Sequence, residues 1–326
     1  MRFLVTGATG KVGQAFIARV LAEPALADAE IVALCHNRIP PAHERVGVVR
    51  GSIAEQATLV RALDGVTHVF HLATVKEDPA LVMDVSIKGL FLLLEAARVS
   101  KTVRQVLLVG GDAAVGHCFV DYPEPVTELS PRRAYPGVYA FSKVLEEEMI
   151  EQYGHQYGLN GTILRAPWIM EKDDFRYALS FGPDQFGGPS WDGLMPPADR
   201  ARYTAENRVP LLLDIRNKPL RRNFVHVSDL VSAMVKAVDN DAARGQLFNI
   251  SMTDTVDYGE VAAILHQTRG MQPVEIKSGF YSNTLSNAKA RAALDWRPQF
   301  DLKMLIEAAF TYQRAADDPR KIWYVG

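Results

Sequence analysis

A glycine-rich segment near the start of the chain is the feature that most restricts the fold. It reads GATGKVG and lies between an apolar run, Phe3–Thr6, and an amphipathic pattern, Val12–Leu21, which predict a strand followed by a helix. Glycines in such a turn let backbone NH groups at the helix N-terminus approach a pyrophosphate. A tight turn without a ligand is the alternative interpretation. The pattern favours a dinucleotide site formed by Gly7, Thr9, Gly10, Lys11, Val12 and Gly13.

Short apolar runs alternate with longer helical patterns through the first half of the chain. The runs that predict strands are Phe3–Thr6, Ile31–Leu34, Val46–Val49, His68–Leu72, Val106–Val109 and Thr162–Arg165. The patterns that predict helices are Val12–Leu21, Ala54–Leu63, Asp84–Val99 and Gly137–Tyr153. Repeated strand-helix-strand order requires a parallel sheet covered by helices on both faces. Residues 1–165 are therefore expected to form a doubly wound α/β domain.

The pattern changes after Arg165. The stretch Phe181–Trp191 is rich in Gly, Pro and aromatic residues and has no clear period, which is typical of a binding loop. Regular elements return at Phe224–Val227, Asp229–Val238 and Leu247–Ile250. We expect residues 224–250 to return to the first domain. Residues 166–223 and 251–326 are expected to form a smaller C-terminal substrate-binding lobe.

Composition excludes several classes of protein. The chain is 48% hydrophobic and 23% charged, which is typical of a compact globular protein. Its 36 basic and 38 acidic residues give a net charge of −2 without a long basic run, so nucleic acid is not an expected partner. Cys35 and Cys118 form no CxxC motif, so we expect no metal site and a reducing, cytoplasmic location. No leader or membrane-spanning stretch is apparent, so no membrane association is expected.

The end of the second predicted strand bears on the choice of cofactor. In dinucleotide-binding folds a carboxylate there accepts the ribose hydroxyls, whereas an arginine accommodates a 2′-phosphate. Here the strand leads into Cys35-His36-Asn37-Arg38, without a carboxylate. His36 and Arg38 therefore favour NADP, with NAD possible. The alternative is that both side chains are only solvated.

Tyr139 and Lys143 lie four residues apart in a helical pattern, so both project from one face of the helix. A phenol with a pKa of about 10 is a poor base at neutral pH, but a nearby cation favours the phenolate. Such a phenol can exchange a proton with an alcohol or sugar hydroxyl, and the ammonium can hold ribose hydroxyls. The pair is therefore the candidate acid/base site. A packed tyrosine beside a solvated lysine is the alternative.

Several motifs occur in an order that resembles the extended short-chain dehydrogenase/reductase family, also called the NAD-dependent epimerase/dehydratase family. They are TGATGKVG at the start, His71-Leu72-Ala73 after the fourth strand, Tyr139-Ala-Phe-Ser-Lys143, Leu164-Arg165-Ala166-Pro167, Arg222-Asn-Phe-Val-His-Val-Ser-Asp229 and the segment Asn287–Pro298. The resemblance covers nearly the whole chain.

The resemblance implies a Rossmann-type domain and hydride transfer between a nicotinamide and a hydroxyl or keto carbon, usually on a sugar nucleotide. Tyr139 is implied as the acid/base and Lys143 as its electrostatic support. Further implied cofactor contacts are Ser52, Ile53, Leu72, Ala73, Thr74 and Pro167, with Ser52 replacing a usual aspartate near the adenine. The family commonly forms homodimers through the helices that match 84–99 and 137–153.

The sequence departs from the family pattern after the fifth strand, where a catalytic Ser or Thr is usual. The chain reads Gly110-Gly111-Asp112-Ala113-Ala114, which puts Asp112 in the third catalytic position. An ionised Asp112 would oppose the phenolate unless it holds a proton or points elsewhere. Asp112 could bind a substrate hydroxyl or cap the loop, Thr74 could supply the missing donor, or the two glycines could leave room for a bulky substrate. Ala113 and Ala114 replace the acid pair of the family's dehydratases, which disfavours water elimination.

The sequence gives less information about the substrate-binding site. Arg222 and Arg291 lie near positions where relatives hold a diphosphate, and Trp168 stands where many relatives place an Asn beside the sugar. Surface arginines and a packed tryptophan are the alternatives. We therefore expect an NAD(P)-dependent oxidoreductase or epimerase acting on a sugar, sugar acid or nucleotide sugar. A non-catalytic dinucleotide-binding regulator is the competing hypothesis, motivated by Asp112.

Overall fold

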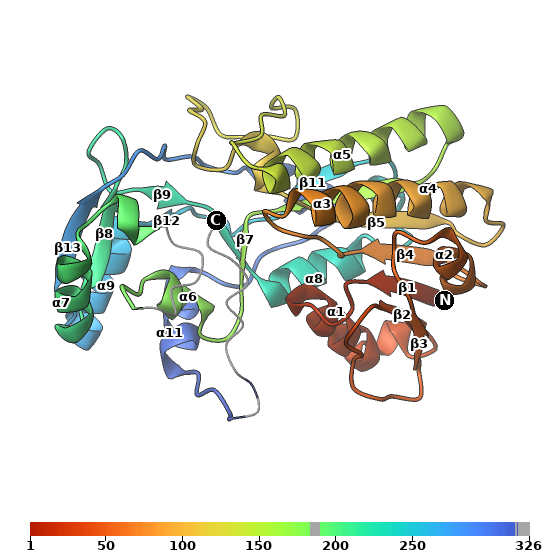
Figure 1. Cartoon of the computed structure of the whole chain (residues 1–326), viewed down its shortest axis with the longest axis horizontal. Helices are drawn as coiled ribbons and strands as arrows, with labels where there is room; N and C mark the ends of the chain where they lie inside the picture. Colours follow the sequence, from red (N-terminus) through yellow and green to blue (C-terminus); the bar gives the residue numbers. More distant parts are fainter. Residues whose placement is uncertain (183–189, 317, 319–326) are drawn as a thin grey trace.

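A seven-stranded parallel sheet forms the centre of the molecule, in the order β11-β6-β5-β4-β1-β2-β3 (Figure 1). The computed structural model describes residues 1–182, 190–316 and 318. The sheet strands are β1 (Arg2–Thr6), β2 (Glu30–Cys35), β3 (Val46–Arg50), β4 (His68–His71), β5 (Gln105–Gly111), β6 (Gly161–Ala166) and β11 (Leu247–Asn249). From β1 the chain adds β2 and β3 on one side and β4, β5 and β6 on the other. The predicted doubly wound α/β fold is confirmed, and its switch point lies between β1 and β4.

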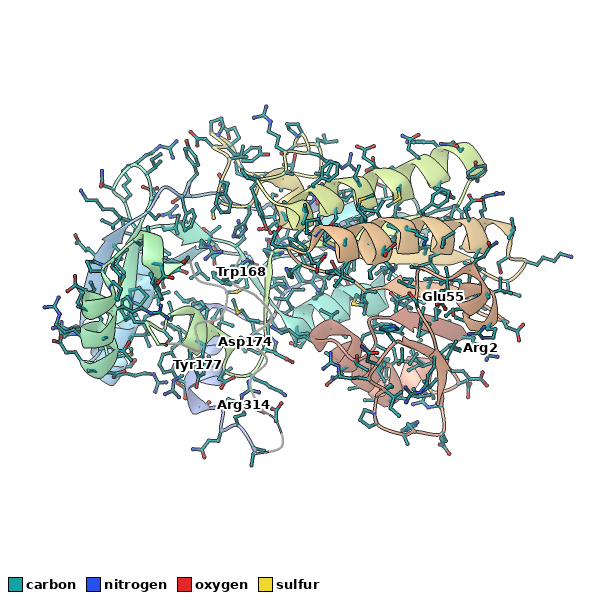
Figure 2. All side chains as sticks on the ribbon, in the orientation of Figure 1. Arg2, Glu55, Trp168, Asp174, Tyr177 and Arg314 are labelled. Carbon is teal, nitrogen blue, oxygen red and sulfur yellow. The ribbon has the colours of Figure 1, made fainter. Side chains whose placement is uncertain are left out.

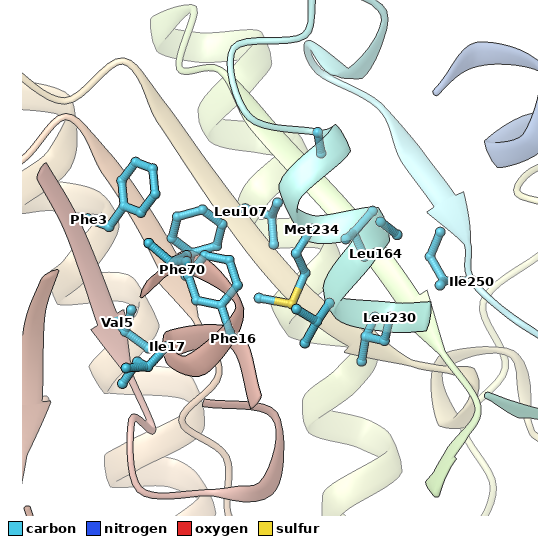
Figure 3. Close-up of a cluster of buried hydrophobic side chains, with 14 of the residues drawn as sticks. Phe3, Val5, Phe16, Ile17, Phe70, Leu107, Leu164, Leu230, Met234 and Ile250 are labelled. Carbon is cyan, nitrogen blue, oxygen red and sulfur yellow. The ribbon is translucent and has the colours of Figure 1, made fainter. Parts of the chain in front are cut away.

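Helices cover both faces of this sheet. On one face lie α1 (Lys11–Ala22) and α8 (Val227–Lys236), and on the other α2 (Gln56–Ala62), α4 (Gly89–Val99) and α5 (Val138–Tyr157). Alternate strand residues serve the two faces: Phe3 and Val5 pack against Phe16 on α1, whereas Leu4 packs on the opposite side (Figure 3). The interior strands are apolar throughout because both of their faces are buried, whereas the edge strand β3 is largely exposed.

A second group of elements lies beside the sheet and has its own apolar core (Figure 1). It contains three two-stranded sheets and several helices. These are β7 (Trp168–Met170) with β10 (Phe224–His226), β9 (Arg221–Arg222) with β12 (Val256–Asp257), β8 (Val209–Leu213) with β13 (Pro273–Lys277), and the helices α6 (Asp174–Ala178), α7 (Pro197–Ala205), α9 (Tyr258–Arg269) and α11 (Leu302–Thr311).

Three observations refine the expected organisation. Phe224–His226 pairs with β7 and not with the central sheet, although the following α8 and β11 do pack on or join that sheet. The helix expected at 84–99 starts with α3 (Pro79–Leu81) and a π-helical segment, Val82–Lys88, before α4. Residues 288–296 include α10 (Ala288–Ala293) and supply Ala290, Leu294 and Trp296 to the core beneath the central sheet. Burial of Trp296 therefore fixes this late segment against α8, where its indole NH donates to the Asp229 carbonyl.

Across the part of the chain that the structure describes, none of the helices has the length and apolar character needed to cross a bilayer. Phe186 and residues 321–326, which belong to segments considered in the sequence analysis, lie outside the described residues.

Candidate functional site

The glycine turn lies at the C-terminal end of β1, next to the end of β4. Gly7 has φ +67°, and a Cβ there would lie 2.8 Å from backbone atoms of Leu72 and Ala73. A Cβ on Gly13 would lie 2.4 Å from the Gly7 carbonyl oxygen. No side chain caps the N-terminus of α1, and its first turn carries no acidic residue. The first amides of α1 are therefore available to an anion, which fits a dinucleotide pyrophosphate.

Substituting Gly13 by Ala is expected to weaken dinucleotide binding at least about tenfold, because the added methyl group collides with the backbone of the turn and displaces it. The matched control is Gly279→Ala, where a Cβ meets nothing within 4 Å and the backbone is unstrained. Titration calorimetry of both variants measures the effect. Equal affinities for the two variants would contradict a role for this turn in binding.

A buried threonine and histidine join the ends of β1 and β4. The Thr6 hydroxyl oxygen accepts hydrogen bonds from the NH groups of Leu72 (3.1 Å) and Ala73 (3.2 Å). It also lies 3.0 Å from Nδ1 of His71, to which it donates. Burial, aided by the charge of Lys143, lowers the pKa of His71 to about 3. His71 is therefore neutral at physiological pH, and Thr6 holds the residues that follow β4 in place.

Lys11 is not directed freely toward a phosphate. Its ammonium donates to the Ile169 carbonyl oxygen at 2.9 Å and pairs with the carboxylate of Asp174 on α6. Figure 2 shows Asp174 and Trp168 between the central sheet and the second group of elements. Lys11 therefore ties the glycine turn to the second group, so backbone amides supply most of the anion site.

The remaining cofactor candidates surround this edge of the sheet. His36 and Arg38 are exposed after β2, and no carboxylate lies between them. Ile53 is buried against Gly89, and the Ser52 hydroxyl accepts from the Ala54 amide. Four further candidates lie in loops at the strand ends: Thr9, Leu72 and Ala73 are partly buried, and Pro167 is buried between β6 and β7. Val12 lies in the first turn of α1 and is partly buried. Thr74 is exposed in the segment after β4.

Tyr139 and Lys143 lie on the first turns of α5, beside the end of β5. A Cβ on Gly111 would lie 3.4 Å from the Tyr139 hydroxyl and 3.6 Å from Cγ of Lys143. The Lys143 ammonium is 5.4 Å from the centre of the Tyr139 ring. Gly111 therefore leaves the phenol uncovered on this side, at the edge that also carries the glycine turn.

Two residues that sequence reasoning missed fix the start of α5. The Glu77 carboxylate accepts from the Val138 amide at 2.9 Å and from the Tyr139 amide at 3.4 Å. The Lys76 ammonium lies 3.5 Å from the centre of the Tyr139 ring. Both come from the segment after β4, which no motif marks. Lys76 is thus a second cation near the Tyr139 ring, in addition to Lys143.

Asp112 is the first residue of a 3₁₀ turn after β5 and is buried. Its carboxylate lies 2.5 Å from Nδ1 of His117, and Nε2 of His117 lies 2.7 Å from the Arg222 guanidinium. Because Arg222 can only donate, Nε2 accepts and Nδ1 donates to Asp112. The Asp112 carboxylate raises the pKa of His117 despite its burial, but Arg222 can donate to Nε2 only if the ring is neutral, so this geometry is that of a neutral His117. Asp112 and Arg222 thus balance each other's charge across His117.

Trp168 completes this chain of contacts. Its ring is stacked on His117, with 5.9 Å between centroids, and the Arg222 guanidinium lies 3.9 Å from its centre. His117 has φ +46°, an uncommon conformation for a residue with a side chain. The structure therefore brings Asp112, Arg222 and Trp168 together through a histidine that the sequence analysis did not select. No spacing rule links positions 112, 117 and 222.

Arg291 occupies a different place. It lies on α10, which packs beside β11, and its carbonyl oxygen accepts from Arg297. Among the described residues, no contact joins the Arg291 side chain to Arg222 or Trp168. The diphosphate role considered for Arg291 therefore gains no geometric support.

A doubly wound parallel sheet with a glycine turn at its switch point defines a Rossmann-type dinucleotide-binding fold. The model of the NAD dependent epimerase/dehydratase family matches residues 3–251, and the chain belongs to this family. The family resemblance inferred from the motifs is confirmed.

Individual relatives agree with this assignment. A putative UDP-glucose 4-epimerase of Methanocaldococcus jannaschii is 23% identical over 328 residues, 95% of this chain and 98% of that protein. A dTDP-glucose 4,6-dehydratase of Mycolicibacterium smegmatis is 28% identical over 174 residues, 50% of this chain and 52% of that protein. The structure of a short-chain dehydrogenase/reductase superfamily protein from Agrobacterium tumefaciens with bound NAD has a TM-score of 0.78 and 21% identity, covering 95% of this chain and 96% of that one. Epimerases and dehydratases are thus both among the similar proteins.

Proposed function

We propose that the chain binds a nicotinamide dinucleotide across the C-terminal edge of its sheet and oxidises or reduces a hydroxyl or keto carbon of a sugar derivative. The observation that carries this proposal is the placement of Tyr139. Its hydroxyl lies beside Gly111 at the end of β5, and β5 neighbours β4, which neighbours β1 and its glycine turn. A bound nicotinamide supplies the hydride acceptor or donor.

The chain's own residues supply binding and proton transfer. Gly7, Gly10 and Gly13 shape the turn whose amides hold the pyrophosphate, and Lys143 holds ribose hydroxyls. Tyr139 takes a proton from the substrate hydroxyl during oxidation and returns it during reduction. Asp112 does not oppose the phenolate strongly, because His117 and Arg222 balance its charge. This charge balance supports a role for Tyr139 as the base although the usual Ser or Thr is missing.

The names of the relatives and the second group of elements support the proposed substrate class. The relatives described above are named for UDP-glucose and dTDP-glucose, which are nucleotide sugars. The partly buried Trp168 offers an aromatic side chain near Asp112, which suits a sugar ring, whereas the buried Arg222 is already bonded to His117. A panel of nucleotide sugars and sugar acids, assayed for a change in nicotinamide absorbance or in epimer ratio, tests the proposal. Failure of every substrate together with failure to bind either dinucleotide would refute it.

The fate of the cofactor during purification distinguishes an epimerase from a dehydrogenase. An epimerase regenerates its cofactor in each turnover and is expected to retain it through purification, whereas a dehydrogenase exchanges it. Dinucleotide released by denaturing the purified protein reports which is the case. Ala113 and Ala114, buried after Asp112, supply no acid for expelling water, so we propose an epimerase or oxidoreductase in preference to a dehydratase.

We retain NADP as the favoured cofactor, because the segment Cys35-His36-Asn37-Arg38 at the end of β2 contains no Asp or Glu and carries exposed His36 and Arg38. The Arg38→Ala variant is expected to bind NADP about tenfold more weakly and NAD unchanged, because only NADP carries the 2′-phosphate. Calorimetric titration of both dinucleotides measures this selectivity. An equal loss of affinity for NADP and NAD would show that Arg38 does not recognise the 2′-phosphate.

A homodimer through α4 and α5 is part of the proposal. These helices expose Phe91, Val99, Phe141 and Tyr157, an apolar set on neighbouring elements. The Phe91→Glu variant is expected to be monomeric, because a carboxylate in such an interface loses its hydration. Light scattering after size-exclusion chromatography measures the molar mass. Leu129→Glu, at an exposed apolar residue outside both helices, is the control. A monomeric native protein would contradict the proposal.

A non-catalytic dinucleotide sensor is the second candidate, and one observation favours it. The Lys143 ammonium donates to the Glu146 carboxylate at 2.7 Å, which offsets the charge that would activate Tyr139. The two hypotheses differ in turnover: a sensor binds dinucleotide without converting any member of the substrate panel.

A further inference from the structure

Lys143 is paired with an acid that the proposed reaction does not use. Its ammonium lies 2.7 Å from Oε2 of Glu146, three residues later on α5. The side chains are 4% and 0% exposed. An ion pair this deeply buried is screened little by solvent, so each partner strongly affects the other's charge and position.

The Glu146 carboxylate is only half satisfied. Its other oxygen, Oε1, is buried and has no hydrogen-bond partner among the residues that the structure describes. The next acid, Glu147, differs: both its oxygens accept from Arg165, and Oε2 also accepts from Arg132. Burial raises the pKa of Glu146, against the opposing charge of Lys143. Glu146 is thus the buried acid on this helix best placed to take up a proton.

Glu146 and the ribose hydroxyls of a bound dinucleotide compete for hydrogen bonds from the Lys143 ammonium. A carboxylate binds an ammonium through a charge-assisted hydrogen bond, roughly twice as strong as one to a neutral hydroxyl. Ribose hydroxyls are neutral, so they compete poorly for Lys143 while Glu146 is ionised. They compete well once Glu146 is protonated.

We propose that Glu146 is a positioning residue that holds Lys143 in the free protein and takes up a proton from solvent when Lys143 turns to the ribose of a bound dinucleotide. The inference rests on the proposed function, since it requires dinucleotide binding. The balance is simple: one proton from water converts the Glu146 carboxylate to the carboxylic acid, and Lys143 stays charged. Dinucleotide affinity therefore rises as the pH falls through the range in which Glu146 protonates.

Other charged or titratable groups near this part of α5 must be separated from Glu146. On the segments packed against it they include His71, Lys76, Glu77, Asp84, Lys88, Asp112, Arg132 and Arg165. His71 stays neutral, because burial lowers its pKa to about 3. Asp112 is hydrogen-bonded to His117, and Asp84 faces Lys88 on the π-helical segment. Arg165 and Arg132 both pair with Glu147, and Glu77 accepts from the Val138 amide. Unlike these groups, Glu146 is hydrogen-bonded directly to Lys143 and loses that contact when Lys143 moves.

The test is calorimetric titration of the native protein with reduced dinucleotide, whose nicotinamide ring is uncharged, between about pH 5 and 8. Titrations in two buffers of different ionisation enthalpy count the protons taken up. We expect proton uptake in the native protein and an affinity that rises about tenfold toward low pH. Glu146→Gln should bind at high pH as tightly as the native protein does at low pH, without proton uptake.

Two further variants sharpen the test. Glu146→Asp keeps the acid and should keep the pH dependence. Glu148→Gln, at an exposed acid on the same helix, should behave as the native protein does. Two outcomes would overturn the inference and leave the proposed function intact. One is binding without proton uptake in the native protein, and the other is a pH dependence of affinity that persists in Glu146→Gln. Absence of dinucleotide binding overturns both the inference and the proposed function. The native-protein measurement decides the matter even if Glu146→Gln does not fold.

Discussion

The Tyr139→Phe variant is expected to lose turnover by about 10² to 10⁴-fold while it binds dinucleotide as the native protein does. The substitution removes only the hydroxyl, which lies beside Gly111 at the open edge of the sheet. The ring still fills its place beneath Lys76, so α5 keeps its position. The measurement is kcat on the substrate found by the panel, with the dinucleotide dissociation constant determined in parallel.

Tyr157→Phe is the matched control, because Tyr157 lies exposed at the far end of the same helix. It should leave both quantities unchanged. Turnover that survives in Tyr139→Phe would remove the assigned proton transfer and favour another acid/base. A simultaneous loss of dinucleotide binding would instead indicate that the phenol shapes the cofactor site.

The His117→Ala variant is expected to lose about 3 to 5 kcal/mol of the free energy of unfolding. His117 is the link between the Asp112 carboxylate and the Arg222 guanidinium, and both of these groups are buried. Removing the imidazole leaves a buried carboxylate and a buried guanidinium without their shared partner. Urea denaturation followed by circular dichroism measures the change.

His155→Ala, at an exposed position on α5, should change stability by less than about 0.5 kcal/mol. The double variant Asp112→Asn/His117→Ala should regain part of the loss, because the unpaired carboxylate charge is gone. A small effect of His117→Ala, equal to that of the control, would show that water satisfies both groups and that the chain of contacts contributes little to stability.

Local sequence patterns predicted the central sheet well, because the burial of a strand is apparent from its own residues. Strands buried on both faces must be apolar throughout, and the glycines of the first turn are required by close backbone contacts. The Tyr139 and Lys143 spacing was likewise readable, since a helical period places both on one face. The prediction was less accurate at Phe224–His226, where a short apolar run pairs with β7 in place of the central sheet. Pairing partners of short strands depend on the whole fold.

The candidate site, too, was predicted only in part from the sequence. Asp112 could be selected from its position after the fifth strand, but its partner could not. His117 and Arg222 meet across 105 positions of sequence, and Lys76 reaches the Tyr139 ring from a segment without a motif. Glu146 follows Lys143 by three residues, so helical spacing could have found it. Its burial, which makes the pair consequential, is a property of packing.

The sequence by itself determined the doubly wound sheet, the dinucleotide turn and the family, because apolar period, glycine spacing and motif order are written along the chain. Only the tertiary structure decided the charge balance of the site. Asp112 is compensated through His117 by Arg222, and Lys143 is held by Glu146. Charge interactions depend on distance and burial in three dimensions, and neither quantity follows from separation along the chain.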